Sequence, residues 1–90
     1  MTIMPSGSEP KPGPFARAVS DEIRLAMTRH RVSGTRLAEM IGRSQSYVSK
    51  RLNHGAAFTA NDVELSCKVL GEDLLTLVTA AVRASRNIKR

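Results

Sequence analysis

One stretch, SGTRLAEMIGRSQSYVSKRL from residue 33 to residue 52, most constrains what this 90-residue chain can fold into. In its first half, three apolar residues follow the spacing of one helix face: Leu37, Ala38 and Ile41. In its second half, Val48 and Leu52 stand four residues apart and form a narrower stripe. Between the halves, Gly42 can end a helix with a positive φ, and Ser44 can cap the next helix. The pattern predicts a helix-turn-helix.

Positive charge is concentrated in and around this stretch. Residues 24–51 hold seven basic residues and one acidic residue, whereas residues 52–82 hold one basic and four acidic residues. Residues 83–90 add four more basic residues, and the chain as a whole has a net charge of +6. Such clustering is typical of a protein that binds a polyanion, although a solvated basic surface has the same composition.

Several classes of protein do not fit the composition. No apolar run approaches the ~20 residues of a membrane span, and the first residues lack the features of a secretory signal. A single cysteine, Cys67, rules out an internal disulfide and a cysteine-based zinc site. The chain has no glycine-rich phosphate loop, no paired acids in an apolar pocket and no nucleophile beside a base. We therefore expect a cytoplasmic protein that is not an enzyme and has no metal, cofactor or membrane partner.

The rest of the chain predicts three further helices and two terminal extensions. Residues 1–14 contain all four prolines and predict a flexible N-terminal arm. The folded domain is expected over residues 15–84, and a basic tail that frays over residues 85–90. The expected helices cover approximately residues 14–31, 34–41, 45–53, 60–70 and 73–84. With no strand signal, the chain is expected to be all-α, a compact bundle of about five short helices.

Particular packing and capping residues follow from the same periodicity. The first helix is expected to bury a face formed by Phe15, Val19, Ile23, Ala26 and Met27. After the third helix, Gly55 is expected to take the special backbone angle of a helix end, with Phe58 as an apolar plug. Thr59 and Asp62 resemble a capping box. The helix at 73–84 is apolar over more than one face, which suits either the core or a homodimer interface.

A series of short matches in the order typical of a known family runs through roughly residues 19–78. They are Ile23-Arg24, Val32-Ser33, Leu37-Ala38-Glu39, Ile41-Gly42, Ser44-Gln45-Ser46-Tyr47-Val48-Ser49, Asn53, Gly55 and Leu70-Gly71 followed by Leu74. Together they resemble the helix-turn-helix domain of lambda-repressor and Cro-like regulators, which are small all-α DNA-binding proteins. Two residues depart from the family pattern. Gly34 replaces a frequent glutamine that contacts a phosphate and braces the recognition helix, and Arg43 replaces an apolar residue.

The resemblance implies that the helix at 45–53 lies in the major groove of double-stranded DNA. With Val48 and Leu52 inward, Ser46, Tyr47 and Lys50 are expected to point most directly outward. Base contacts are expected from Gln45, Ser46, Ser49 and Lys50. Phosphate contacts are expected from Thr35, Arg43, Ser44, Tyr47, Arg51 and Asn53. Two other roles for Tyr47 stay open, a base contact and packing along the helix surface. Arg24 is expected to be solvated or paired with a nearby acid.

The resulting hypothesis is a sequence-specific DNA-binding transcriptional regulator of phage or bacterial type, acting as a repressor that occupies an operator. One alternative is a protein-interaction module such as an antitoxin. Another is the DNA-binding half of a longer repressor, for example a phage immunity repressor.

Overall fold

The computed structural model describes residues 10–87, and this part of the chain contains five helices and no strand. In chain order the helices are α1 (Pro14–His30), α2 (Gly34–Ile41), α3 (Gln45–Leu52), α4 (Ala60–Leu70) and α5 (Leu74–Asn87). The expected all-α bundle of five short helices is confirmed. Residues 1–9 of the expected arm and 88–90 of the expected tail lie outside the described residues.

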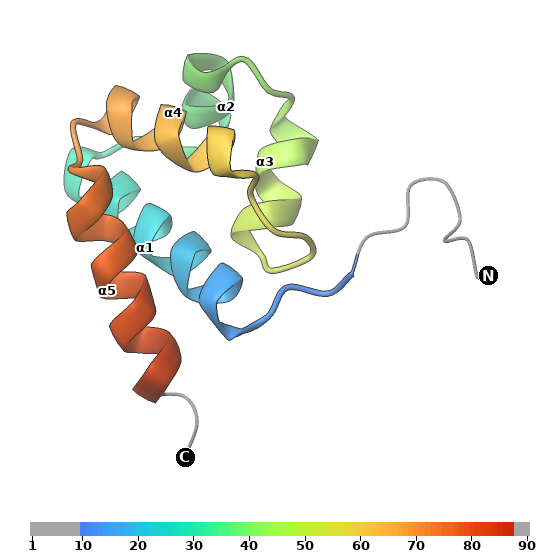
Figure 1. The fold of residues 1–90 in the computed structure, drawn as a ribbon. Helices are drawn as coiled ribbons and strands as arrows, with labels where there is room; N and C mark the ends of the chain where they lie inside the picture. The colour runs from blue at the N-terminus through green and yellow to red at the C-terminus, as the bar shows by residue number, and fades with distance from the viewer. Residues whose placement is uncertain (1–9, 88–90) are drawn as a thin grey trace.

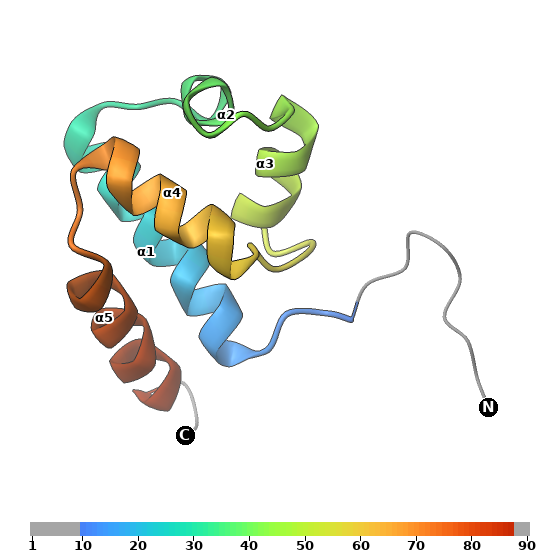
Figure 2. The same cartoon turned by 45° about the horizontal axis from the view of Figure 1, so that its top comes forward.

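The helices are arranged around α1, which packs against α3, α4 and α5 (Figure 1). Of these, α5 lies alongside α1 over most of its length, and α4 crosses above it. The helix pair α2 and α3 completes the bundle. Figure 2 looks nearly along α2 and shows α3 at the edge of the bundle opposite α5. This arrangement leaves one side of α3 turned away from every other helix.

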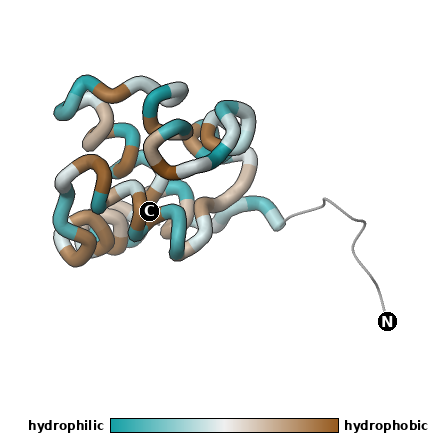
Figure 3. Tube along the Cα trace, turned by 90° about the horizontal axis from the view of Figure 1, so that it is seen from above, coloured by the Kyte–Doolittle hydropathy of each residue, from teal (hydrophilic) through white to brown (hydrophobic). Residues whose placement is uncertain are grey.

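The core is built from aliphatic side chains contributed by all five helices. Ile23, Leu37 and Val48 are completely buried, and Leu52 is almost so. Hydrophobic and hydrophilic residues alternate along the helices (Figure 3), as expected for helices that bury one face. Burial of a side chain of this size contributes about 1.5–3 kcal/mol relative to its exposure. The apolar stripe predicted for α3 therefore packs into this core and helps to attach the helix.

Two expectations about the ends of the bundle are corrected. Phe15 is 45% exposed rather than buried, because it lines an unfilled pocket of about 440 Å³ together with Phe58 and Leu74. Near the C-terminus, residues 85–87 continue α5 instead of fraying. There, Ala84 packs against the core and the Ser85 hydroxyl donates to the Val82 carbonyl oxygen at 2.7 Å, which extends the helix.

The helix boundaries around the turn form as their sequences predict. The hydroxyl oxygens of Ser33 and Ser44 accept hydrogen bonds from backbone N–H groups of α2 and α3, each at 3.1 Å. Gly42 ends α2 with φ +74°, a conformation that costs other residues about 1–2 kcal/mol. Thr59 and Asp62 form the expected capping box at the start of α4.

The end of α3 differs from expectation. His54, not Gly55, takes the left-handed conformation, with φ +68°. The N–H groups of His54 and Gly55 donate to the Arg51 and Lys50 carbonyl oxygens, which is the Schellman pattern. A Cβ atom on Gly55 would lie 2.9 Å from Lys50 Cγ and 3.1 Å from Lys50 O. Glycine is therefore required here for space rather than for its φ.

Candidate nucleic-acid interface

The side of α3 that faces away from the bundle carries the four residues expected to contact bases. Gln45, Ser46, Ser49 and Lys50 are all exposed, while Val48 and Leu52 face the core as expected. The buried stripe sets which way the helix is turned, and the four polar side chains follow from it by helical geometry. An exposed face of amide, hydroxyl and ammonium groups can donate to and accept from base edges.

Beside this face, residues of α1, α2 and α3 line a pocket of about 320 Å³. Thr35, Gln45, Ser49 and Asn53 line it together with Gly34, whose missing side chain leaves space there. The structure thus brings together residues expected to contact bases and residues expected to contact phosphates. The first N–H groups of a helix have no partner within the helix and suit an anion.

Arg24 also lines this pocket, and its position was not predicted. Its Nη2 atom donates to the Leu52 carbonyl oxygen at 2.7 Å and to Asn53 Oδ1 at 2.9 Å, so Arg24 joins α1 to the end of α3. The Asn53 amide nitrogen donates in turn to the Ser49 carbonyl oxygen at 2.9 Å. No local pattern signals this contact, because Arg24 and Asn53 are 29 residues apart.

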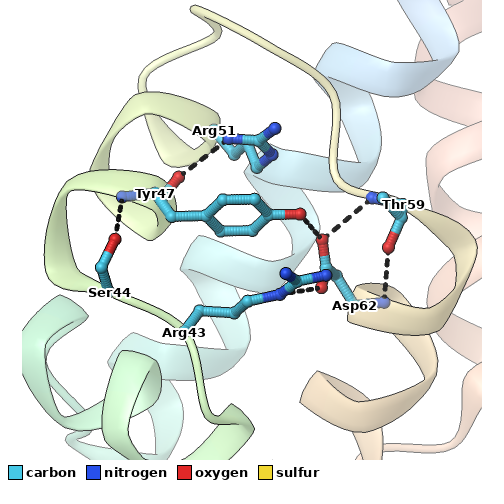
Figure 4. Close-up of polar contacts among 6 residues, drawn as sticks. All are labelled: Arg43, Ser44, Tyr47, Arg51, Thr59 and Asp62. Atoms are coloured by element: carbon cyan, nitrogen blue, oxygen red, sulfur yellow. Dashed lines mark hydrogen bonds and ion pairs between the residues drawn. The ribbon is translucent and has the colours of Figure 1, made fainter.

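Tyr47 does not point outward as expected. Its side chain is half-buried and turns toward α4, where its hydroxyl donates to Asp62 Oδ2 at 2.5 Å (Figure 4). The ring lies between two guanidinium groups, with Arg51 Cζ 3.6 Å and Arg43 Cζ 4.3 Å from its centroid. The ring thus packs neither outward nor only along its own helix, but against Asp62 of α4.

Asp62 is the centre of this cluster, which comprises Arg43, Tyr47, Arg51, Thr59 and Asp62 and is called the Asp62 cluster below. The Asp62 side chain is 1% exposed. Its carboxylate accepts from the Tyr47 hydroxyl, from Arg43 Nε at 3.1 Å and from the Thr59 backbone N–H at 3.1 Å. A buried carboxylate is stable only when it is paired and hydrogen-bonded in this way.

The protonation states within the Asp62 cluster follow from burial and hydrogen bonding. Burial by itself raises the pKa of Asp62, but the hydrogen bonds from Tyr47, Thr59 and Arg43 outweigh it and hold that pKa below its usual value. Burial, together with the hydrogen bond to Asp62, raises the pKa of Tyr47. At neutral pH the pair is therefore an ionised carboxylate and a neutral phenol.

These contacts change the set of residues that face solvent. Arg51 is only 8% exposed and packs on the Tyr47 ring, and Tyr47 itself is bound to Asp62 on α4, so neither side chain points freely into solvent. The cause is Asp62, which lies on another helix and therefore leaves no trace in the pattern of α3. Both residues were expected to contact phosphates, and those two contacts stay untested predictions. The other four residues expected to contact phosphates are exposed: Thr35, Arg43, Ser44 and Asn53.

Three further features of residues 10–87 concern other kinds of site: the thiol of Cys67, the grouping of potential metal ligands and the length of the helices. Cys67 is buried, and burial followed by the charges of Glu72 and Asp73 raises the pKa of its thiol, which makes it a poor nucleophile. Within that range no three His, Cys, Asp or Glu residues are grouped so that they could hold a metal ion. Of the five helices described, none is long and apolar enough to span a membrane.

On the opposite side of the bundle, α5 exposes apolar residues. Leu74 and Leu75 are 42% and 74% exposed. Leu74 also lines the 440 Å³ pocket with Phe15, Phe58 and Val78. This is the surface on which the expected homodimer would form.

Comparison with known proteins identifies the fold. No family model matches the chain, and no curated protein matches it. The fold is similar to the crystal structure of the clp gene regulator ClgR from Corynebacterium glutamicum, with a TM-score of 0.75 and 19% sequence identity. The similarity covers 86% of this chain and 81% of that chain. The all-α arrangement is thus shared over most of both chains.

Proposed function

We propose that this chain is a sequence-specific double-stranded DNA-binding transcriptional regulator of the lambda-repressor-like class, acting as a repressor that occupies an operator. The observation that carries the proposal is the exposed polar face of α3, held by a buried stripe and surrounded by positive charge. The similarity of the fold to a structure described as a gene regulator supports it.

In this proposal α3 lies in the major groove with its N-terminal end toward the base edges. Gln45 pairs with adenine through its amide, and Lys50 binds a guanine edge. The hydroxyl groups of Ser46 and Ser49 can bond to several kinds of base edge. A good bidentate pair contributes about 1–3 kcal/mol of discrimination between bases. The phosphate contacts come from Thr35, Arg43, Ser44 and Asn53, which are all exposed.

The exposed apolar surface of α5 supports a homodimer that reads a palindromic operator. Two subunits would then bind half-sites about 34 Å apart, which is one turn of DNA. Light scattering of the protein on its selected DNA measures this directly, with two subunits per site expected. One subunit per site would contradict the palindrome and leave DNA binding in place.

The experiment that tests the function is selection of bound duplexes from a random library, followed by affinity measurements over a range of salt. We expect one enriched motif and a linear fall of log K with log salt, with a slope of about −0.9 per phosphate contact. Gln45→Ala should reduce discrimination at one base pair by roughly 5–150-fold, the equivalent of about 1–3 kcal/mol. Asn87→Ala, an exposed amide at the end of α5, is the matched control and should have no effect.

Two outcomes would contradict the proposal. One is the absence of an enriched motif, and the other is an affinity that does not depend on salt.

A second candidate function, an antitoxin-like protein-interaction module, is favoured by the apolar pocket formed by Phe15, Phe58, Leu74 and Val78. In that case a protein partner would co-purify in stoichiometric amount. Gln45→Ala and Lys50→Ala would leave the activity unchanged, whereas Leu74→Glu would abolish partner binding.

A further inference from the structure

We propose that Asp62 is a positioning residue for DNA recognition: through Tyr47 it fixes the rotation of α3, and through Arg43 it orients a phosphate-binding guanidinium. The inference rests on the proposed function and adds to it a residue on α4 that does not itself face the DNA. Asp62 acts through the two side chains that it binds.

The first step concerns the attachment of α3. This helix has eight residues, and its apolar contact with the core is a narrow stripe formed by Val48 and Leu52. Two anchors in one line along a helix leave rotation about that line weakly constrained. A rotation of about 10° moves side-chain tips, which lie some 5–6 Å from the helix axis, by about 1 Å. A displacement of that size breaks a base hydrogen bond.

Tyr47 supplies an anchor that lies off this line, in addition to the Arg24 contact at the end of α3. It precedes Val48 in the helix, and its ring extends across to α4, where the hydroxyl is bound by the buried Asp62 carboxylate (Figure 4). Arg51, one turn further along α3, donates to the Tyr47 carbonyl oxygen and covers one face of the ring. The ring therefore cannot swing without breaking contacts on both helices, and the rotation of α3 is determined.

Arg43 carries the second effect of Asp62. It lies in the turn between α2 and α3, and its side chain is 40% exposed. The ion pair uses Nε, at 3.1 Å from Asp62 Oδ1, so the two terminal nitrogens can donate to a phosphate. A guanidinium held at one nitrogen loses less side-chain entropy when it binds an anion than a mobile one does.

The positioning role of Asp62 is testable because its charge and its contacts have opposite effects on DNA binding. The negative charge weakens binding to any DNA, whereas the contacts with Tyr47 and Arg43 strengthen binding to the selected sequence. Asp62→Asn removes a negative charge from beside the interface, which strengthens binding to any DNA through electrostatics. The same change replaces one of the two acceptor oxygens with a donating amide group, so Tyr47 and Arg43 can no longer both be held. A positioning residue should thus show weaker binding to the selected sequence and equal or stronger binding to unrelated DNA.

The experiment uses the full chain and two duplexes of equal length, the motif selected from a random library and a scrambled sequence. Binding of the wild type, Tyr47→Phe, Asp62→Asn and Arg43→Ala is measured by fluorescence anisotropy over a range of salt. The temperature is kept well below each variant's unfolding transition. We expect Tyr47→Phe and Asp62→Asn to bind the motif at least fivefold more weakly. On scrambled DNA Tyr47→Phe should be unchanged, and Asp62→Asn should bind equally or more tightly.

Arg43→Ala should instead weaken binding to both duplexes and reduce the salt slope by about 0.9, the contribution of one phosphate. The matched control is Asp73→Asn, because Asp73 directly precedes α5 and caps it by accepting from the Thr76 N–H at 2.9 Å, and α5 lies across the bundle from α3 (Figure 1). It makes the same chemical change at a helix cap, where asparagine is as suitable as aspartate, so it should leave the ratio of the two affinities unchanged.

One result overturns the inference. The wild type prefers the motif, and the Tyr47→Phe and Asp62→Asn variants are folded, yet their affinities for both duplexes stay within twofold of the wild-type affinities. An equal loss on both duplexes in Tyr47→Phe and Asp62→Asn overturns it as well, because a positioning residue should affect the motif more than the scrambled sequence. Both results leave the proposed function standing. A wild type with neither sequence preference nor salt dependence overturns the proposed function and the inference with it.

Discussion

Replacing Gly55 with alanine should destabilise the domain by about 1–2 kcal/mol. The new Cβ would lie 2.9 Å from Lys50 Cγ and 3.1 Å from the Lys50 carbonyl oxygen. Both atoms would therefore have to move away from the Cβ by a few tenths of an ångström. The side chain can rotate away, but the carbonyl oxygen accepts the hydrogen bond from Gly55 itself at 2.8 Å. Moving it stretches the bond that ends α3.

The expected decrease in the free energy of unfolding for Gly55→Ala combines three effects. Overpacking typically costs about 1–3 kcal/mol, and a weakened hydrogen bond costs up to about 1 kcal/mol. Against these, alanine restricts the unfolded chain and returns about 0.4–1 kcal/mol. For a domain of this size, 1 kcal/mol corresponds to about 4–8 °C in Tm. We therefore expect Tm to fall by about 5–15 °C, measured by circular dichroism and confirmed by urea unfolding.

Two other glycines serve as controls. In Gly34→Ala the new Cβ would meet only Leu52 Cδ1 at an ordinary 3.7 Å, so stability should be unchanged or slightly increased. In Gly42→Ala it would meet nothing within 4 Å, but φ is +74°, so the cost of about 1–2 kcal/mol is purely conformational. If Gly55→Ala unfolds at the temperature of Gly34→Ala, the steric reasoning is refuted.

Three further predictions concern ionisable groups. Hydrogen bonds from His30 at 2.7 Å and Arg29 at 2.9 Å hold the pKa of Glu72 below its ordinary value of 4.5. Because a lowered pKa stabilises the fold above the unfolded pKa, the free energy of unfolding should decrease as the pH falls below about 4.5, and less steeply in Glu72→Gln. Absorbance titration of the single tyrosine should give a pKa for Tyr47 above 10.0 that decreases in Asp62→Asn; an unchanged value would contradict the hydrogen bond. The Cys67 thiol should react with a thiol reagent only at the rate of unfolding, so rapid reaction of the folded protein would show that it is not buried.

Much of the fold was predictable because its determinants are local. Each helix boundary is marked by a residue within a few positions, such as Ser33, Ser44 or the pair Thr59 and Asp62. Periodicity identified most of the core for the same reason. It failed at Phe15, because periodicity identifies a helix face but not how far the neighbouring helices cover it.

The candidate site was predictable only in part. The exposed face of α3 follows from the buried stripe, so its four polar residues were located correctly on the surface; their contact with bases stays a prediction. The contacts that hold α3 were missed. Arg24 reaches Asn53 across 29 residues and Tyr47 reaches Asp62 across 15, distances at which a helical pattern carries no information about side-chain partners.

The alternation of roles along α3 has an evolutionary consequence under the proposed function. Gln45 and Ser46 are exposed, whereas Tyr47 and Val48, the next two residues, attach the helix to the domain. Mutations at the first pair can therefore accumulate with little penalty to folding, and descendants of a duplicated gene can acquire new operators while the scaffold is inherited unchanged. Mutations at the second pair instead disturb the attachment of α3, whatever DNA the protein binds.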